Sequence, residues 1–326
     1  MTTGPAYPAT TARPQADQAA AEPRRNLLSI ALRSQRREPG ASGYLWISPA
    51  VLLYAAFVLG PLGYAVYLSF YDWNGAGPKT FVGGANYAAL VQDPQLAASF
   101  GHAGFLMIFF AVVPIAVALF LTAVMARTKI KGLAIYRTIL FLPQVIALVA
   151  IAVVWEWILA PDGPLDAALR AVGAGALAQP WLGSFTWALP TVGAIGSWIG
   201  YGFAMVLFMS GVGKIPQSLY DAARVDGAGP VSEFFAVTLP GLRREIVVAL
   251  TLTLTSALTT FDIVYVMTAG GPGTTTNLPA YTVFNLAFTQ FEVGKAAAAG
   301  VVLAAVVFLV ALVILRIGRT EESSHG

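Results

Sequence analysis

Residues 296–315 read AAAAGVVLAAVVFLVALVIL, a run of twenty residues without a charged side chain. A helix of this length is about 30 Å long, which matches the hydrocarbon core of a bilayer. Apolar residues stand on every face of the run instead of alternating with polar ones, which favours a helix over a strand of an outer-membrane barrel. The run therefore predicts a transmembrane helix.

Five further windows have the same character. The six windows are Tyr44–Phe70, Ala103–Ala126, Ile139–Ala160, Trp187–Val212, Ile246–Thr268 and Ala296–Leu315. Only Glu156 and Asp262 place a formal charge in them. The whole chain of 326 residues is 57% hydrophobic and 11% charged, whereas soluble domains carry about 25% charged residues. We predict an all-α, polytopic membrane protein with six transmembrane helices.

Lys and Arg are distributed unevenly over the connections between these windows. Sixteen fall on one side, namely Arg13, Arg24, Arg25, Arg33, Arg36, Arg37, Arg127, Lys129, Lys131, Arg137, Lys214, Arg224, Arg243, Arg244, Arg316 and Arg319. Three fall on the other, namely Lys79, Arg170 and Lys295. Cytoplasmic loops carry the excess of basic residues, so we predict that both termini are cytoplasmic and that the membrane is the inner one.

The ends of the chain differ from its middle. Residues 1–43 are rich in Ala, Pro and Thr, turn basic toward their end and contain no apolar run long enough for a signal peptide. We expect a disordered, basic cytoplasmic leader there; the alternative is a weak amphipathic helix around Leu27–Leu32 on the membrane surface. Residues 44–318 form the six-span domain, and residues 319–326 a short cytoplasmic tail.

The connection between the fourth and fifth windows, residues 214–245, has a distinct pattern. It reads KIPQSLYDAARVDGAGP from Lys214, then VSEFFAVTLP to Pro240. Ser218 followed by Asp221 is a helix-start signature, and Gly227, with Gly229 and Pro230 behind it, is a helix stop. A second short helix is expected over Ser232–Val237. This predicts an amphipathic helix–turn–helix that docks on a partner; the alternative is a loop that packs under its own bundle.

Three parts of this loop resemble a known motif. Asp221-Ala222-Ala223, Asp226-Gly227-Ala228 and Leu239-Pro240 resemble the EAA loop of binding-protein-dependent ABC importer permeases, in particular the carbohydrate-uptake, maltose-type branch. In that family the loop forms the coupling helix that seats in the ATPase subunit. The resemblance implies that the coupling residues are Asp221, Ala222, Ala223, Asp226, Gly227, Leu239 and Pro240.

The resemblance extends over Tyr44 to Gly318. Further stretches that are similar to this branch are LSFYDWN from Leu68, FVGGANY from Phe81, FLP from Phe141 and FDIVYVMTAGGPG from Phe261. The last of these is typical of the first of two paired permeases. Two departures are visible: the loop opens with Asp221 where Glu is usual, and Gly-Leu-Arg-Arg follows Pro240 without the frequent proline.

The sequence also bears on the energy source. The pairs Gly213-Lys214 and Gly294-Lys295 are not followed by Ser or Thr, so neither is a P-loop. The chain has no cysteine, and His102 and His325 do not form a zinc motif. We therefore expect a transport subunit that is not an enzyme and binds no cofactor or nucleic acid. The family implies the partners: a second homologous permease, two ATPase subunits that hold ATP and Mg, and an extracytoplasmic solute-binding protein.

Four residues are candidates for the substrate path: Trp198, Tyr201, Asp262 and Tyr265. A charge inside a span usually faces a cavity or a partner, so Asp262 either accepts hydrogen bonds from a sugar or holds a neighbouring helix or turn. Trp198 and Tyr201 either stack on a sugar or pack between helices. Gly196 and Gly200 form a GxxxG pair that allows close helix approach. No Lys or Arg lies deep in a span, which favours a neutral sugar over a phosphorylated one.

Two rival functions remain open from the residues alone. A stand-alone secondary transporter or channel predicts transport without an ATPase. A membrane scaffold or sensor predicts partner binding without solute flux. Neither explains the pattern from Asp221 to Pro240.

Overall fold

The computed structural model of the chain describes residues 1–4, 41–127 and 132–320. Most of the predicted leader, the basic residues Lys129 and Lys131, and all but the start of the predicted tail lie outside the described residues. The chain divides into two compact units, Met1–Pro61 and Leu62–Gly326.

The first window is helical from Tyr44 to Leu68. Helix α3, Ala41–Tyr54, continues through the π-helical turn η1, Ala55–Leu59, into α4, Gly60–Leu68. The stretch Tyr44–Leu68 is long and apolar enough to cross a membrane. This confirms the first predicted span.

Four more helices of the second unit meet the same length and composition. These stretches are Pro94–Met125, Ala188–Val212, Arg243–Met267 and Val293–Gly318. They correspond to α6 (Pro94–Met107) with η2 (Ile108–Val112) and α7 (Val113–Arg127), to α11 (Ala188–Val212), to α15 (Arg243–Thr259) with α16 (Asp262–Met267), and to α18 (Val293–Thr320). The predicted class, a helical membrane protein, is confirmed.

The third window is not one straight helix, and this corrects the predicted span Ile139–Ala160. It consists of α8, Leu133–Val145, and α9, Leu148–Ile158, which meet at an angle of 92°. Ile146 and Ala147 between them are extended, with ψ of 139° and 131°. Pro143 precedes the break and lacks the N–H that would bond one turn back. The described chain therefore has five such helices, or six if the bent pair counts as one span.

The fifth window is also interrupted. Helix α15 ends at Thr259, Thr260 is extended with ψ of 125°, and α16 begins at Asp262. Asp262 therefore stands at the first turn of a new helix, where a carboxylate is favoured by the helix dipole.

Helix α11 is the centre of the second unit. Val192, Ile195 and Ile199 belong to a buried cluster with residues of α6, α9 and α16. Met205 and Phe208 belong to a second buried cluster with residues of α7. Gly193 allows Phe109 of η2 to come so close that an added Cβ would lie 2.6 Å from its ring. Gly196 makes the same allowance for Phe110, whereas Gly200 faces Pro114 at an ordinary 3.5 Å, so only the first glycine of the GxxxG pair marks a close approach.

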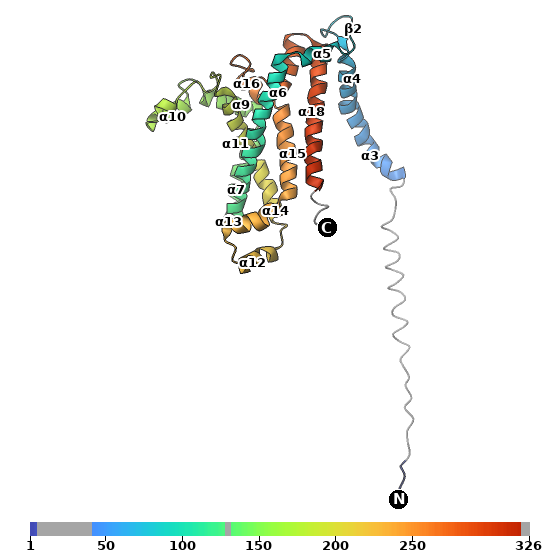
Figure 1. Ribbon diagram of the computed structural model, residues 1–326, viewed down its shortest axis with the longest axis vertical. Helices are drawn as coiled ribbons and strands as arrows, with labels where there is room; N and C mark the ends of the chain where they lie inside the picture. Colours follow the sequence, from blue (N-terminus) through green and yellow to red (C-terminus); the bar gives the residue numbers. More distant parts are fainter. Residues whose placement is uncertain (5–40, 128–131, 321–326) are drawn as a thin grey trace. The chain divides into compact units, whose positions relative to one another are not determined.

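The shorter elements gather at the two ends of the second unit. One end carries the hairpin β1 (Tyr71–Asp72) with β2 (Thr80–Phe81), and α5 (Ala85–Val91), α10 (Pro164–Ala171), η3 (Gly175–Leu177), α17 (Pro279–Phe284) and η5 (Asn285–Thr289). The other end carries α12 (Gln217–Val225), α13 (Pro230–Glu233), η4 (Phe234–Thr238) and α14 (Leu239–Gly241) (Figure 1).

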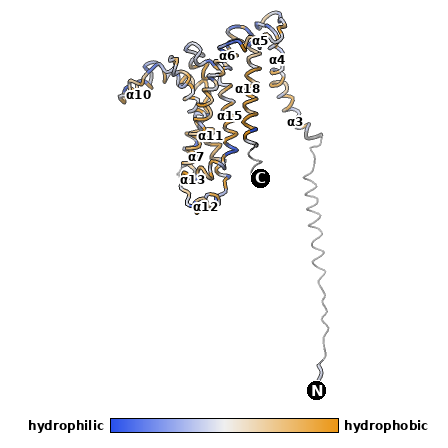
Figure 2. The backbone as a smooth tube through the Cα atoms, viewed as in Figure 1, coloured by the Kyte–Doolittle hydropathy of each residue, from blue (hydrophilic) through white to orange (hydrophobic). Residues whose placement is uncertain are grey.

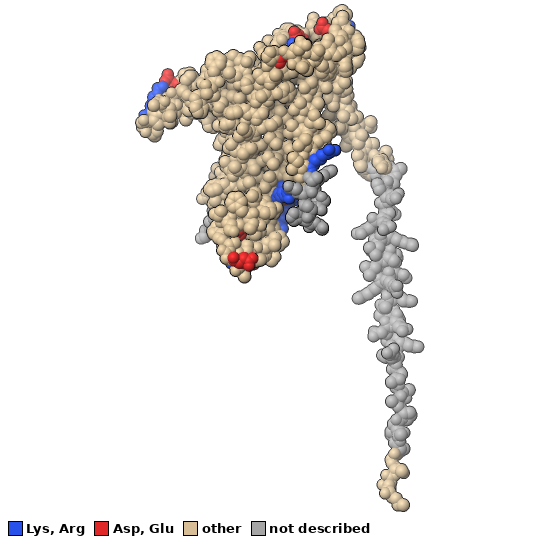
Figure 3. All heavy atoms as spheres, in the orientation of Figure 1, with Lys and Arg blue, Asp and Glu red and all other residues tan. Residues whose placement is uncertain are grey.

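Hydropathy follows the same division within this unit. The long helices are mostly apolar along the middle of the unit (Figure 2). On the face shown in Figure 3, Lys, Arg, Asp and Glu of the unit gather toward the two ends and leave the middle without charge. The middle is therefore the part that suits a bilayer core.

Candidate functional site

The predicted helix–turn–helix is present. Its first helix, α12, starts after Pro216, which has φ of −59° and ψ of 132°. Ser218 makes no capping bond, so the predicted start at Ser218 is wrong. The carbonyl of Pro216 instead accepts a hydrogen bond from the N–H of Leu219 at 3.1 Å. The fixed φ of proline thus sets the direction in which the helix begins.

The predicted stop at Gly227 is confirmed. Gly227 has φ of +81°, a conformation that favours glycine. Its N–H bonds to the carbonyl of Arg224 at 3.0 Å, and the N–H of Ala228 bonds to that of Ala223 at 2.9 Å. The chain therefore leaves α12 through a glycine cap.

The second helix starts earlier than predicted. It begins at Pro230 instead of Ser232, because proline suits the first position of a helix as well as ending the preceding one. It continues as α13, η4 and α14 to Gly241 and so includes Leu239 and Pro240. We call residues 216–241 the arm.

Two side-chain bonds join the two helices of the arm. Arg224 Nε donates to Glu233 Oε2 at 3.2 Å, and the Glu233 side chain is only 6% exposed. The hydroxyls of Tyr220 and Thr238 lie 3.2 Å apart. Arg224 also lies 3.4 Å from Asp221, where both side chains are exposed. The Arg224–Glu233 pair and the hydroxyl pair hold α12 at a fixed distance from the second helix.

Helix α12 does not pack under its own bundle. None of its residues is buried within the described chain, and Leu219 and Val225 are 51% and 88% exposed. Asp221, Ala222, Asp226 and Gly227 are exposed as well, and Ala223 is half-buried. The described structure thus favours the docking alternative over the packing one.

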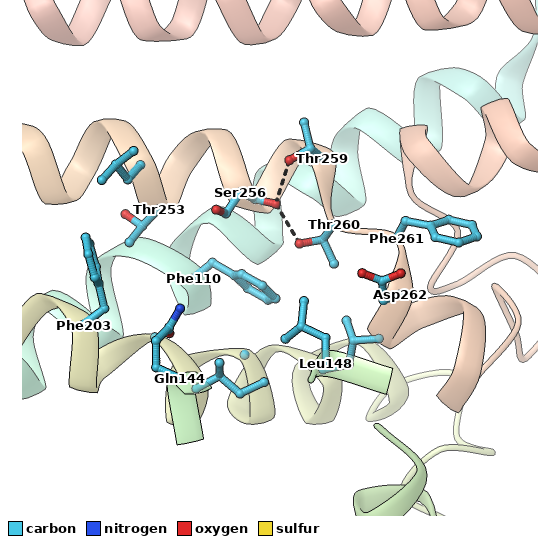
Figure 4. Close-up of a pocket in the computed structure, with 15 residues that line it drawn as sticks. Phe110, Gln144, Leu148, Phe203, Thr253, Ser256, Thr259, Thr260, Phe261 and Asp262 are labelled. Atoms are coloured by element: carbon cyan, nitrogen blue, oxygen red, sulfur yellow. Dashed lines mark hydrogen bonds between the residues drawn. The ribbon is translucent and has the colours of Figure 1, made fainter. Parts of the chain in front are cut away.

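A cavity of about 450 Å³ lies between the two broken spans. Gln144 and Leu148 come from the two sides of the α8–α9 break, and Thr259, Thr260 and Asp262 from the α15–α16 break (Figure 4). Phe110 of η2 and Phe203 of α11 also line the cavity. So do Thr253 and Ser256 of α15 and Phe261. Backbone that is irregular at membrane depth is tolerated where it lines such a cavity.

The cavity presents polar side chains that have no partner among the described residues. The side chains of Asp262 and Gln144 make no hydrogen bond or ion pair with any described residue. The hydroxyls of Thr259 and Thr260 donate to backbone carbonyls of α15 at 2.9 and 2.7 Å, so their oxygens are left as acceptors. No Lys or Arg is among the lining residues. The cavity can therefore offer hydrogen-bond acceptors and one amide to a neutral polar ligand.

The other predicted path residues lie outside the cavity lining. Trp198 packs edge-on against Trp155 with ring centroids 5.6 Å apart. Tyr201 is half-buried on α11. Tyr265 stacks on Phe261 at 5.1 Å, and Phe261 does line the cavity. The geometry thus brings Asp262 to the cavity and leaves the roles of the three aromatic residues as predictions.

A family model decides what kind of protein this is. The model described as binding-protein-dependent transport system inner membrane component matches residues 104–319, which include the arm and the cavity. The chain belongs to this family.

Two curated relatives align in sequence with this permease along most of their length. It is 33% identical to a probable ABC transporter permease protein, YurN, of Bacillus subtilis, over 86% of this chain and 96% of that protein. It is 30% identical to the diacetylchitobiose uptake system permease protein NgcF of Streptomyces coelicolor, over 84% of this chain and 81% of that one.

A solved structure shares the fold. The permease superposes with a TM-score of 0.72 on a chain of a bacterial ABC transporter involved in the import of the acidic polysaccharide alginate. The match covers 85% of this chain and 94% of that one at 23% identity.

Sequence reasoning missed most of the cavity wall of the permease. Phe110, Gln144, Phe203 and the hydroxyl residues of α15 were not among the predicted path residues. A signal for some of them was present: residues 251–260 read TLTLTSALTT, which is rich in hydroxyls for a span, and Gln144 follows Pro143. Among the described residues, no group of three or more His, Cys, Asp or Glu is placed to hold a metal ion.

Proposed function

We propose that this permease is the transmembrane subunit of an ATP-driven importer of an uncharged sugar. It works with a second homologous permease, with two ATPase subunits that hold ATP and Mg, and with a solute-binding protein that delivers the sugar. It lies in the inner membrane with both termini cytoplasmic, so the arm faces the cytoplasm.

The exposed arm is the observation that carries this proposal. Its first helix shows Leu219 and Val225 to solvent, while the Arg224–Glu233 pair fixes it to the second helix. Exposed apolar side chains on a helix that is held on a rigid support suit a groove on a partner protein. The second helix of the arm leads into α15, whose far end lines the cavity. Movement of the arm is thereby transmitted to the cavity wall.

The cavity supports the choice of substrate. Its volume falls in the range of about 300–1,000 Å³ that is usual for small-molecule sites. Asp262 can accept hydrogen bonds from sugar hydroxyls, and Gln144 can both accept from them and donate to them. A carboxylate without a cationic partner also repels an anionic sugar. The relative NgcF is named for uptake of diacetylchitobiose, which is uncharged.

Substitution of Gly227 tests the coupling role of the arm. Gly227→Val places a β-branched residue at φ of +81°, which is strongly disfavoured, although the site has open space. Gly229→Val is the matched control, because Gly229 has φ of −75° and open space as well. In the reconstituted importer we expect Gly227→Val to lose most of the ATPase stimulation by the loaded binding protein, and Gly229→Val to keep it.

The outcome separates the proposal from its rival. Normal stimulation in Gly227→Val overturns the coupling role of the arm. Sugar uptake by the permease alone, without ATPase subunits, supports a stand-alone transporter in its place.

A further inference from the structure

Five aromatic rings pile on one another at the end of the second unit that is opposite to the arm, where α16 lies (Figure 1). They belong to Phe261 directly before α16, Tyr265 of α16, Tyr281 and Phe284 of α17, and Phe288 of η5. The ring centroid of Phe284 lies 5.0 Å from that of Phe261 and 5.1 Å from those of Tyr265 and Phe288. We call these five residues the aromatic shelf.

The spacing of the rings along the chain turns them to one side. Tyr281, Phe284 and Phe288 follow one another at three and four residues, which is the spacing of one helix face. Leu286 on another face is buried in a cluster with alanines of α18. Phe288 is 68% exposed, and Tyr265 is 45% exposed. The bundle therefore supports the shelf from behind and leaves its rings accessible.

The loop that follows α16 supports the shelf as well. Gly270 has φ of +81°, and an added Cβ there would lie 2.7 Å from the ring of Tyr281. The glycine thus lets this ring lie against the backbone of the loop. The hydroxyls of Thr268 and Thr276, which lie 2.8 Å apart, close the same loop. Rings that are already held in place lose little freedom when a ligand packs on them.

The aromatic shelf is continuous with the cavity. The ring of Phe261 stacks on Tyr265 at 5.1 Å, and Phe261 also lines the cavity. Asp262, the next residue, lines the cavity with a carboxylate (Figure 4). The phenol hydroxyls of Tyr265 and Tyr281 make no hydrogen bond with any described residue. Aromatic faces with available polar groups therefore lead from the exposed Phe288 to the cavity.

We infer that the aromatic shelf is a second sugar subsite, on which the sugar rests before it enters the cavity. The subsite rests on the proposed function, from which its ligand is taken. One face of a pyranose ring presents mainly C–H groups, which pack on the negative face of an aromatic ring, while the sugar hydroxyls bond to the phenol oxygens. An aromatic belt at the membrane boundary accounts for Tyr residues there, but not for the continuation of the rings into the cavity.

Saturation-transfer NMR on the purified full-length chain tests the subsite. The chain is kept in lauryldimethylamine oxide, whose headgroup is not a sugar, and the probes are maltose, cellobiose and diacetylchitobiose. Irradiation of aromatic protons passes saturation to the C–H protons of a sugar that lies on a ring. We expect this transfer for at least one probe, with a half-saturating concentration that Phe288→Leu raises about 2- to 10-fold, as one aromatic contact contributes. Tyr265→Leu should act likewise, and Tyr265→Phe, which keeps the ring, should have a smaller effect.

Phe81→Leu is the matched control. Phe81 is 70% exposed on β2, at the same end of the second unit and outside the shelf. Gel filtration shows which variants are folded, and Tyr265→Leu serves if Phe288→Leu is not. An unchanged half-saturating concentration in the folded shelf variants overturns the inference. An equal increase in Phe81→Leu overturns it as well, and so does the absence of transfer from the wild-type chain to all three probes.

Gln144→Leu separates the shelf from the cavity. A weaker sugar contact in Gln144→Leu alone confines the sugar to the cavity, which overturns the inference and leaves the proposed function standing. Failure of the proposed coupling is measured separately, as normal ATPase stimulation in Gly227→Val. If Phe288→Leu instead prevents the second permease from co-purifying, the shelf is a contact between the two permeases and the inference is wrong.

Discussion

At the scale of single residues, the arm depends on one buried carboxylate. The Glu233 side chain is 6% exposed and accepts a hydrogen bond from Arg224, whose own side chain is 55% exposed. Water screens the bond to Glu233 from the Arg224 side only, whereas it screens the contact with Asp221 from both sides, so the first interaction is the stronger one. Of the two carboxylates near Arg224, Glu233 is therefore expected to contribute more to the stability of the arm than Asp221.

Glu233→Gln is expected to loosen the arm. The loss of a charge-assisted bond costs about 1–3 kcal/mol locally. Amide hydrogen exchange of residues 217–225 in the purified chain measures the effect, and we expect it to become about 5- to 100-fold faster, since each 1.4 kcal/mol is a factor of ten. Asp221→Asn is the control. Its contact with Arg224 is 3.4 Å long and exposed, so it contributes little. Equal acceleration in both variants would show that the bond between Arg224 and Glu233 contributes no more to the arm than the contact with Asp221.

Single residues also show what sequence can and cannot predict. Gly227 is predictable because only a glycine accepts its φ at little cost, and the glycine stands directly after a helical pattern. The start of α12 is not, because Ser218 and Pro216 both carry start signals and the choice depends on the backbone before them. Asp262 stands out in the sequence as a charge in an apolar run, whereas the packing of Trp198 against Trp155 is visible only in the structure.

At the scale of elements, the close contacts of α11 decide how the broken third span is placed. A Cβ at Gly202 would lie 2.6 Å from the backbone oxygen of Leu140 and 3.0 Å from the Cα of Phe141. A backbone cannot turn aside as a side chain does, so α8 would have to move. Gly200 on the same helix faces Pro114 at an ordinary 3.5 Å.

Gly202→Ala is therefore expected to destabilise the permease. Overpacking of this kind costs about 1–3 kcal/mol. The apparent melting temperature in detergent should fall by a few degrees relative to the wild type. Gly200→Ala makes the same chemical change two residues away and should leave that temperature nearly unchanged. A similar drop in both variants would mean that the loss of glycine itself, and not the contact with α8, is responsible.

Spans are predictable as elements, and their breaks are not. A run of about twenty apolar residues has few ways to exist other than as a helix in lipid, so six windows were identified. Hydropathy is averaged over the whole window, so it does not reveal a single extended residue inside the window. The breaks at Ile146–Ala147 and at Thr260 replace intrahelical hydrogen bonds with cavity-facing groups. Pro143 and the hydroxyl-rich end of α15 were signals for them, but many spans carry such residues without breaking.

At the scale of the whole molecule, the distribution of Lys and Arg predicts which end of the permease faces the cytoplasm. Sixteen of nineteen Lys and Arg fall on the side that includes the arm, and this imbalance is the basis of the proposed orientation. The second unit carries its charges at both ends, so the positions of charged residues alone do not distinguish inside from outside (Figure 3). The sign of the charges does distinguish the two sides, because most of the Lys and Arg lie at the end that carries the arm.

Cysteine labelling in whole cells tests the orientation directly. The chain has no cysteine, so a single introduced thiol is the one reactive site. Val225 at the end of α12 is 88% exposed, and Val172 after α10 is 77% exposed, so the two positions offer matched reactivity at opposite ends of the second unit (Figure 1). A membrane-impermeant maleimide is added to cells in which it can reach the outer face of the inner membrane. We expect it to modify Val172→Cys. Val225→Cys should react only after the inner membrane is broken. The reverse pattern would place the arm outside, where no ATP is available, and the proposed coupling through the arm would then be wrong.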